Sequence, residues 1–260
     1  MKVFVITGST TGIGFGLADA LMALHCEVVI NGRTQEKIDK ACDLLEEKHN
    51  RRPFGYPANV CHRDDIQALW DAAFAQFGRI DFWLNNAGTI HPQLPFASQD
   101  PKQIESVVTT NMFGLMYGTQ VALQGMLKQG HGQIFNMEGY GSDGMKRPGM
   151  AIYGSTKSAS RYFTQSLILE TKESPVKVCT MSPGIVVTDL LRWSYEEGTD
   201  DNMKWAQFMF NLVADRVEVV APWMAKKILA NNKHGAHVNW LSFYRILYYG
   251  FSYPFRKRVF

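Results

Sequence analysis

A tyrosine and a lysine lie four residues apart in the stretch "AIYGSTKSA", at Tyr153 and Lys157. If this stretch is helical, the two side chains share one face of the helix and lie one turn apart. A cation next to a phenol favours the ionised phenolate and lowers its pKa, which would make Tyr153 an acid/base group. A surface helix with a polar pair of no chemical role gives the same nine residues. The rest of the chain has to separate the two interpretations.

A glycine-rich stretch near the N-terminus has the composition of a nucleotide-binding turn. "ITGSTTGIGFGLADAL" follows an apolar run and places Gly8, Gly12 and Gly14 where a strand would turn into a helix. Glycines permit a tight turn there and let backbone N–H groups approach a pyrophosphate, which the helix N-terminus attracts. The spacing G-x-x-x-G-x-G in this context predicts a dinucleotide site.

The end of the second apolar run indicates which dinucleotide binds. The text "VVINGRT" offers Arg33 and Thr34 and lacks the acidic residue that would bind the ribose hydroxyls of NAD. Arginine presents a planar fork that suits a phosphate, so the sequence predicts NADP(H). An ordinary surface arginine is the alternative.

These residues need a scaffold, and the chain alternates short β-rich runs with longer helical patterns. This alternation predicts an α/β fold in which one doubly wound Rossmann-type domain spans residues 1–260. The stretch 189–216 interrupts this alternation of strands and helices. The expected strands are 2–7, 27–31, 54–58, 80–85, 132–137, 176–182 and 236–241, and the expected helices are 13–24, 35–48, 63–77, 102–128, 153–172 and 217–230.

Composition narrows the functional class. Hydrophobic residues make up 46% and charged residues 20% of the 260 residues, which is typical of a globular protein with a large core. A net charge of +3 is too small to indicate nucleic acid as a partner. The four cysteines are widely spaced, and no metal site is expected, since His234 and His237 lack a third ligand. With no leader and no long apolar run, the sequence predicts a cytoplasmic protein.

Four motifs in order resemble the short-chain dehydrogenase/reductase family: "TGSTTGIG", "NNAG", "YGSTK" and "SPGIVVTD". The resemblance covers nearly all of residues 1–240 and implies a sheet of seven parallel strands and a homodimer or homotetramer. It also implies that Asn111 holds a water in a proton relay. Implied contacts with the cofactor come from Gly8, Ser9, Thr11, Gly12, Ile13, Gly14, Arg33, Thr34, Asn59, Val60, Asn86, Ala87, Gly88, Tyr153, Lys157, Pro183, Gly184, Val186 and Thr188.

The resemblance decides the question about Tyr153 and Lys157. It implies that Lys157 binds the nicotinamide ribose and lowers the pKa of Tyr153, which is the catalytic acid/base. A phenol near pKa 10 must fall by roughly two to three units to work, which asks for about 3–4 kcal/mol of differential stabilisation.

The serine that most members place about thirteen residues before the tyrosine is missing. Counting forward from the strand puts Glu138 and Gly139 at the usual serine positions. Ser142 is the nearest hydroxyl that a shifted loop could offer to the substrate carbonyl, and Tyr140 competes with it. Ser142 is the predicted fourth catalytic residue, and a solvated turn residue is the alternative.

The text of residues 132–191 resembles the branch that contains chlorophyll(ide) b reductases. This implies an NADPH-dependent reduction of a carbonyl on a bulky apolar substrate, with a formyl group on a tetrapyrrole as the most specific expectation. A lipid or steroid-type ketone is the second expectation. A dinucleotide-binding scaffold without catalysis is the third, because the serine region is altered.

Two further segments bear on the substrate and on partners. The interrupting stretch 189–216 is rich in apolar residues, with a small helix expected over 203–213, and we expect it to form a lid over an apolar substrate. Its apolar residues are Trp193, Tyr195, Met203, Trp205, Phe208, Met209 and Phe210. Residues 241–260 mix aromatic residues with Arg256, Lys257 and Arg258. Such a mixture suits either peripheral contact with a membrane or a subunit interface.

Overall fold

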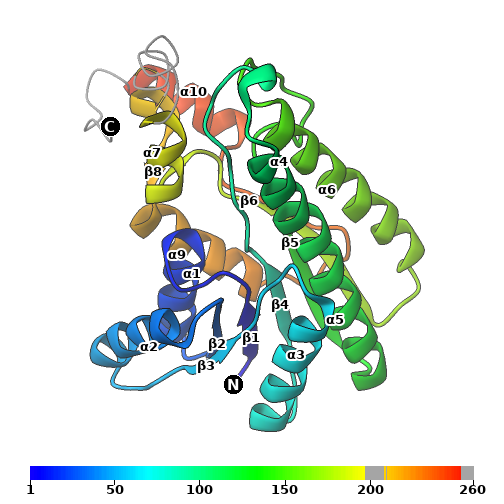
Figure 1. Ribbon diagram of the computed structural model, residues 1–260. Helices are drawn as coiled ribbons and strands as arrows, with labels where there is room; N and C mark the ends of the chain where they lie inside the picture. The colour runs from blue at the N-terminus through cyan, green and yellow to red at the C-terminus, as the bar shows by residue number, and fades with distance from the viewer. Residues whose placement is uncertain (197–207, 209, 253–260) are drawn as a thin grey trace.

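A computed structural model describes residues 1–196, 208 and 210–252, and its centre is one sheet of seven parallel strands (Figure 1). The strand order is β3-β2-β1-β4-β5-β6-β9, so the direction of winding reverses beside β1. Each strand expected from the sequence is present within two residues or so of its predicted ends. The strands are β1 (Val3–Ile6), β2 (Glu27–Gly32), β3 (Phe54–Pro57), β4 (Phe82–Asn85), β5 (Gly132–Met137), β6 (Val176–Ser182) and β9 (His237–Asn239).

Helices cover both faces of the sheet, as Figure 1 shows. One layer consists of α1 (Gly12–Ala23), α2 (Gln35–His49) and α9 (Val217–Leu229), and the opposite layer contains α3 (Arg63–Phe77), α5 (Leu115–Gln129) and α6 (Ala151–Glu170). Alternate residues of β1 supply the two cores: Phe4 and Ile6 pack with the first layer, and Val5 packs with the second. The predicted doubly wound α/β fold is therefore confirmed.

The longest expected helix differs from its prediction. Where the sequence predicts one helix over 102–128, the structure has α4 (Pro101–Val108), a π-helical segment η2 (Thr109–Gly114) and α5. The wider turn lies at Asn111, whose side chain bonds to neighbouring segments. A π segment inside a helix often marks a functional position, because it displaces a side chain from the regular face.

Several short elements lie outside the sheet. A 3-10 turn, η1 (Phe96–Ser98), precedes α4, and α7 (Asp189–Glu196) begins the interrupting stretch. A two-stranded pair of β7 (Val186–Val187) and β8 (Asp215–Arg216), which the sequence did not predict, brackets that stretch. Of the helix expected over 203–213, residues 208 and 210–213 are helical, and the others lie outside the described residues.

The chain continues past the sheet into a helix that the sequence did not predict, α10 (Phe243–Ser252). Arg256, Lys257 and Arg258 follow it and lie outside the described residues. Within the described ranges, none of the helices combines the length and apolar character needed to cross a bilayer.

Candidate active site

The glycine turn between β1 and α1 leaves space only for backbone. Gly8 and Gly12 have φ values of +62° and +59°, in the left-handed region that disfavours side chains. A Cβ at Gly14 would lie 2.5 Å from Asn86 Nδ2 and 2.6 Å from the Gly8 carbonyl oxygen. The Thr11 side chain does not cap α1, so the first N–H groups of the helix are available to a ligand. The turn thus offers backbone N–H donors to an anion such as a pyrophosphate.

Two asparagines hold the turn in shape. Asn86 Nδ2 donates to the carbonyl oxygens of Thr7 (2.9 Å) and Gly8 (3.0 Å). Asn31 Oδ1 accepts from the Gly8 N–H at 3.2 Å, while its Nδ2 donates to Ala58 O at 3.1 Å. The sequence pointed to Asn86 as a residue that lines the cofactor, but in the structure its amide braces the turn. Asn31 was not predicted as a site residue, and a buried amide at a strand end is the signal that could have found it.

The residues predicted for the adenosine side include a cation, Arg33, that has no ion-pair partner in the described part of the chain. Arg33 and Thr34 are exposed at the start of α2, and Arg33 forms no ion pair within the described ranges. Asn59 uses its side-chain oxygen locally, to accept from Cys61 N at 3.2 Å. Val60 is buried, and a Cβ at Gly114 would lie 2.8 Å from its Cγ2. Among the described residues, no carboxylate therefore pairs with the Arg33 charge.

Tyr153 and Lys157 face the same site from the first turns of α6. The Lys157 ammonium lies 5.7 Å from the centre of the Tyr153 ring and donates to Met137 O at 3.3 Å. Both side chains reach Gly139: a Cβ there would lie 2.6 Å from the Tyr153 hydroxyl and 3.2 Å from Lys157 Cε. The helical register expected from the sequence thus brings the phenol and the amine together at the end of β5.

The expected direction of the tyrosine shift is wrong for the protein without cofactor. Burial raises the pKa of Tyr153 to about 12 instead of lowering it. Burial also lowers the pKa of Lys157 to about 8, although the nearby Glu138 carboxylate opposes this. Both groups lose hydration, and each then favours its neutral form, so loss of water outweighs the attraction between phenolate and ammonium.

Asn111 lies with this pair. Its Nδ2 donates to Thr89 O (2.9 Å) and to Thr156 Oγ1 (3.1 Å), and its Oδ1 accepts from Thr89 N at 2.9 Å. A Cβ at Gly88 would lie 3.4 Å from Asn111 Oδ1 and 3.9 Å from Lys157 Nζ, so Gly88 separates the two groups. The π segment therefore carries Asn111 close to Lys157, and its role in a proton relay stays a prediction. Thr156, one residue before the lysine, was missed.

A buried histidine holds the start of α6. The Tyr153 backbone N–H donates to His91 Nε2 at 3.3 Å, and the His91 Nδ1 lies 2.8 Å from Pro92 O. This pair of contacts requires a neutral ring with its proton on Nδ1. Sequence analysis did not single out His91, because one histidine after a strand has no distinctive spacing.

No side chain occupies the position of the usual serine, since Gly139 is the residue beside the Tyr153 hydroxyl. The loop turns back at once, with Ser142 N donating to Gly139 O at 3.0 Å and Ser158 Oγ donating to Gly141 O at 2.6 Å. The hydroxyls of Ser142 and Tyr153 are not hydrogen-bonded to each other. Tyr140 is half-buried, and burial raises the pKa of its phenol. The role of Ser142 therefore stays a prediction.

The segment after β6 closes the other side of the glycine turn. A Cβ at Gly12 would lie 3.7 Å from Thr188 Cγ2, so the turn and this segment are in contact. Gly184 has a φ of +70°, and a Cβ there would lie 2.9 Å from Leu241 Cβ. Pro183 is buried, and Val186 belongs to β7. Their contacts with a nicotinamide stay a prediction.

A polar cluster joins α7 to the loop after β4. Arg147 donates to Tyr195 Oη and to Gln93 Oε1, each at 2.6 Å. Tyr195 packs edge-on against Phe210, and both are buried. Trp193 is half-buried and Phe208 is exposed, while Met203, Trp205 and Met209 lie outside the described residues. Ordinary packing explains Tyr195 and Phe210, and the lid stays a prediction. Neither Arg147 nor Gln93 was selected from the sequence, because neither has a distinctive spacing.

Behind the site, a chain of buried polar side chains connects sheet and helices. Trp83 Nε1 donates to Asn85 Oδ1 (2.8 Å), and Asn85 Nδ2 donates to Asn136 Oδ1 (2.8 Å) and Thr119 Oγ1 (3.0 Å). Asn136 Nδ2 in turn donates to Thr164 Oγ1 at 3.0 Å. This network ties β4 and β5 to α5 and to α6, the helix that carries Tyr153. Within the described ranges, no three His, Cys, Asp or Glu side chains are placed to hold a metal.

Comparison with known proteins gives a family match and close sequence relatives. Residues 2–198 match the short chain dehydrogenase family. Over 94% of its length the chain is 35% identical to a probable chloroplastic chlorophyll(ide) b reductase, NYC1, of Oryza sativa subsp. japonica. Over 87% it is 36% identical to the chloroplastic chlorophyll(ide) b reductase NOL of Arabidopsis thaliana. The chain spans 50% and 65% of these two relatives, so they are considerably longer than it is.

Solved structures share the fold at lower identity. A 3-ketoacyl-(acyl-carrier-protein) reductase from Brucella melitensis complexed with NADH has a TM-score of 0.78 and 22% identity, over 92% of this chain and 96% of that one. The closed form of serine dehydrogenase complexed with NADP+ has a TM-score of 0.78 and 24% identity, over 91% and 93%. Since both dinucleotides occur among proteins of this fold, the fold does not select one.

Proposed function

The chain belongs to the short-chain dehydrogenase family, and from this membership we propose that it is an NADP(H)-dependent reductase of an aldehyde or ketone on a bulky apolar substrate. The observation that carries the proposal is the convergence of Tyr153, Lys157 and Asn111 at the end of β5, beside a glycine turn built for a pyrophosphate.

The residues of the turn fit a nicotinamide dinucleotide. Gly8 and Gly14 let the turn pack tightly, since a Cβ would lie 2.9 Å from Ala87 Cα at Gly8 and 2.5 Å from Asn86 Nδ2 at Gly14, and the uncapped start of α1 offers donors to a diphosphate. A Cβ at Gly88 would lie 3.9 Å from Lys157 Nζ, and we expect this ammonium to donate to a ribose hydroxyl of the bound cofactor. When bound, the reduced nicotinamide supplies a hydride to the carbonyl carbon.

Tyr153 supplies the proton that completes the reduction. With a pKa of about 12 its phenol is protonated at neutral pH, which is the form that can donate to a developing alkoxide. The O–H bond of Tyr153 breaks as the new O–H bond of the alcohol forms. Asn111 and Lys157 border the route by which solvent would return a proton to the phenolate.

Arg33 supports NADP(H) over NAD(H). It is exposed, lacks an ion pair within the described ranges, and no acidic residue ends β2 to repel a 2′-phosphate. A bidentate contact between guanidinium and phosphate is strong and directional.

The substrate proposal combines the names of the relatives with the tight approach at Gly139. Where most family members carry a serine side chain, a Cβ would lie 2.6 Å from the Tyr153 hydroxyl, so Gly139 cannot supply the usual hydroxyl to the carbonyl. The relatives named chlorophyll(ide) b reductase make a formyl group on a tetrapyrrole the first candidate, and a lipid or steroid-type ketone is the second.

The experiment is a substrate panel read as oxidation of NADPH and of NADH. It includes tetrapyrrole aldehydes, long-chain aldehydes and steroid ketones. Tyr153→Phe should abolish turnover and leave NADPH affinity nearly unchanged. Tyr162→Phe, at an exposed position of the same helix, is the matched control and should be fully active. No turnover across the panel, together with tight NADPH binding, would favour the scaffold instead.

Two variants then decide which hydroxyl binds the carbonyl. If Ser142 does so, Ser142→Ala should lower kcat by about 10²–10³-fold, the usual cost of one lost oxyanion donor, and Tyr140→Phe should not. The reverse pattern would assign the role to Tyr140. Full activity in both would show that neither hydroxyl is needed.

A further inference from the structure

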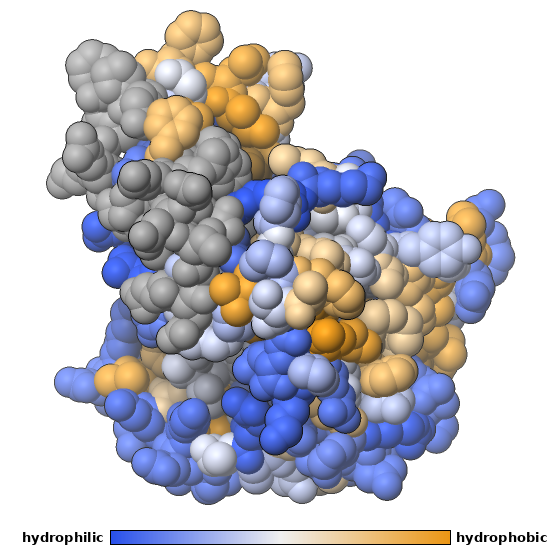
Figure 2. All heavy atoms as spheres, turned by 45° about the horizontal axis from the view of Figure 1, so that its top comes forward, coloured by the Kyte–Doolittle hydropathy of each residue, from blue (hydrophilic) through white to orange (hydrophobic). Residues whose placement is uncertain are grey.

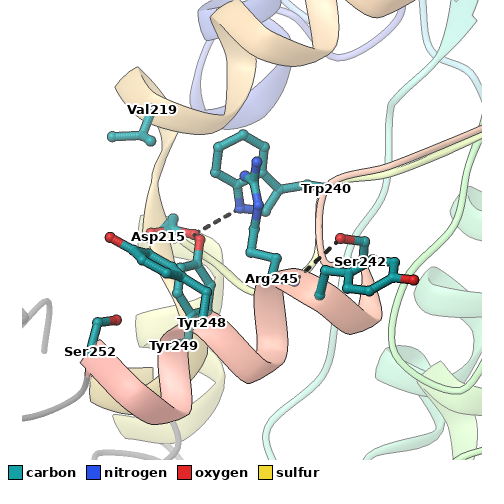
Figure 3. A pocket seen from close by; sticks show the side chains of 9 residues that line it. Asp215, Val219, Trp240, Ser242, Arg245, Tyr248, Tyr249 and Ser252 are labelled. Carbon is teal, nitrogen blue, oxygen red and sulfur yellow. Dashed lines mark hydrogen bonds between the residues drawn. The ribbon is translucent and has the colours of Figure 1, made fainter.

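The last described helix, α10, is attached firmly to the body of the protein. The Arg245 guanidinium stacks on the Trp240 ring, 3.3 Å from its centre, and lies 5.6 Å from the centre of the Trp223 ring. Asp215 accepts hydrogen bonds from Trp240 Nε1, at 2.7 Å, and from the Tyr249 hydroxyl. Figure 3 shows Arg245 rising from α10 against Trp240, with Asp215 between Trp240 and Tyr249. These contacts fix the orientation of α10.

The rest of α10 is apolar and faces solvent. Four aromatic side chains are 66–83% exposed, namely Phe243, Tyr244, Tyr248 and Phe251, and Ile246 and Leu247 are more than 40% exposed. Figure 2 shows hydrophobic side chains gathered over the projecting end of the molecule, where α10 lies in Figure 1. A contiguous patch of large apolar groups on a surface indicates a partner of matching chemistry.

The charge of this region points to an anionic partner. All 24 acidic residues precede residue 241, and the last twenty residues contain Arg245, Arg256, Lys257 and Arg258. The net charge of +3 therefore originates in these last twenty residues. A two-fold contact through α10 would bring the positive charge of both copies to one interface, with no acidic residue in the last twenty residues of either copy to balance it. An anionic lipid surface attracts the positive charge and accepts the aromatic side chains at the level of its headgroups.

We propose that α10 is a docking helix for an anionic lipid bilayer, on which it lies without crossing. With ten residues it is far too short to span the hydrocarbon, so it binds along the interface. The helix begins two residues after Leu241, which contacts Gly184 in the segment after β6. Docking therefore holds that segment close to the bilayer. The inference is independent of the reaction proposed above.

The test is co-sedimentation of the full chain with lipid vesicles. Vesicles of phosphatidylcholine alone are compared with vesicles that contain about 30% phosphatidylglycerol, at low and high salt. We expect binding to the anionic vesicles that weakens as salt increases. No binding to either vesicle would overturn the proposal.

Two sets of variants locate the binding surface. The triple change Phe243→Ser, Tyr244→Ser and Phe251→Ser should lower the partition coefficient by about tenfold or more, because three interfacial side chains are lost. The double change Phe96→Ser and Tyr162→Ser, at positions that are 64% and 74% exposed elsewhere, is the matched control and should bind as the original chain does. Equal losses in both sets would refute a specific role for α10.

A third change separates charge from apolar contact. Replacing Arg256, Lys257 and Arg258 by serine should lower affinity for anionic vesicles on the order of a hundredfold and remove most of the salt dependence. Unchanged binding would also overturn the proposal. The alternative is that α10 packs against a second copy of the chain, which sedimentation velocity of the same proteins tests. If the original chain is a dimer or tetramer that does not bind vesicles, and the Phe243/Tyr244/Phe251 variant is a monomer, then α10 is a subunit interface. Phe251→Ser alone serves if the triple variant fails to fold.

Discussion

Replacing Lys157 with methionine should stabilise the free protein while it destroys activity. The lysine is 4% exposed, and burial lowers its pKa from 10.5 to about 8. At about 1.4 kcal/mol per pKa unit, holding the ammonium in the folded protein at pH 7 costs about 3 kcal/mol relative to the unfolded chain. Lys157→Met removes this cost but also loses the hydrogen bond to Met137 O, which destabilises the folded protein by about 1 kcal/mol. The free energy of unfolding should therefore rise by about 2 kcal/mol at pH 7.

The pH dependence has a definite sign. The folded pKa is lower than the unfolded one, so the unfolded chain binds more protons between pH 8 and pH 10.5, and stability rises with pH across that window. The penalty is complete below pH 8. Burial raises the pKa of Cys42 and Cys179 to about 11, and these thiols lower stability above pH 9. The rise caused by Lys157 is therefore clearest between pH 8 and pH 9.

The assay is urea unfolding at several pH values without cofactor. The original chain should gain stability relative to Lys157→Met as the pH increases from 7 to 9, and the difference between them should shrink. Lys172→Met, at an exposed lysine, is the control and should follow the original chain throughout. Parallel profiles for the original chain and Lys157→Met would refute the reasoning, since they would mean that Lys157 is not desolvated.

Three further predictions concern the cofactor site and the catalytic lysine. Arg33→Ser should weaken NADPH binding by about 10- to 100-fold and leave NADH binding unchanged, because it removes charge-assisted contacts to a 2′-phosphate, and calorimetric titration measures both. Gly14→Ala should cost about 1–3 kcal/mol in thermal unfolding and abolish dinucleotide binding, since the added methyl group meets Asn86 Nδ2; a normal melting temperature would contradict this. Glu138→Gln removes the carboxylate that raises the pKa of Lys157, so the pH-dependent gain in stability should start below pH 8, and an unchanged profile would show that Glu138 has no influence.

The parts of the fold that the sequence predicts are those with local signals. Each of the seven strands is a short apolar run beside turn residues, and Tyr153 and Lys157 face one site because a helical period of 3.6 residues requires it. The π segment at Asn111 has no local signal, because an extra residue in a helical turn is stabilised by the partners of its side chain, Thr89 and Thr156.

Other features depend on residues distant in sequence and could not be predicted from local text. His91 and Arg147 reach their partners across 62 and 48 residues, and neither has a distinctive spacing. The direction of the pKa shift of Tyr153 depends on how completely the folded chain excludes water from the phenol. The spacing of Tyr153 and Lys157 carries no information about that burial. The helical state of 243–252 similarly rests on the contacts of Arg245 and Tyr249 with Trp240 and Asp215.

The buried network of Asn85, Asn136, Thr119 and Thr164 has a consequence for how the protein tolerates change. Amide and hydroxyl pairs match in only one alignment, so a slip of α6 by a single residue would leave several polar groups in the core without partners. Aliphatic side chains at those positions would pack in several neighbouring alignments of α6 against the sheet, and these alignments would have similar energies. A variant with aliphatic residues there could therefore melt at a higher temperature and still be a poorer enzyme, because its proton donor would be distributed over several positions.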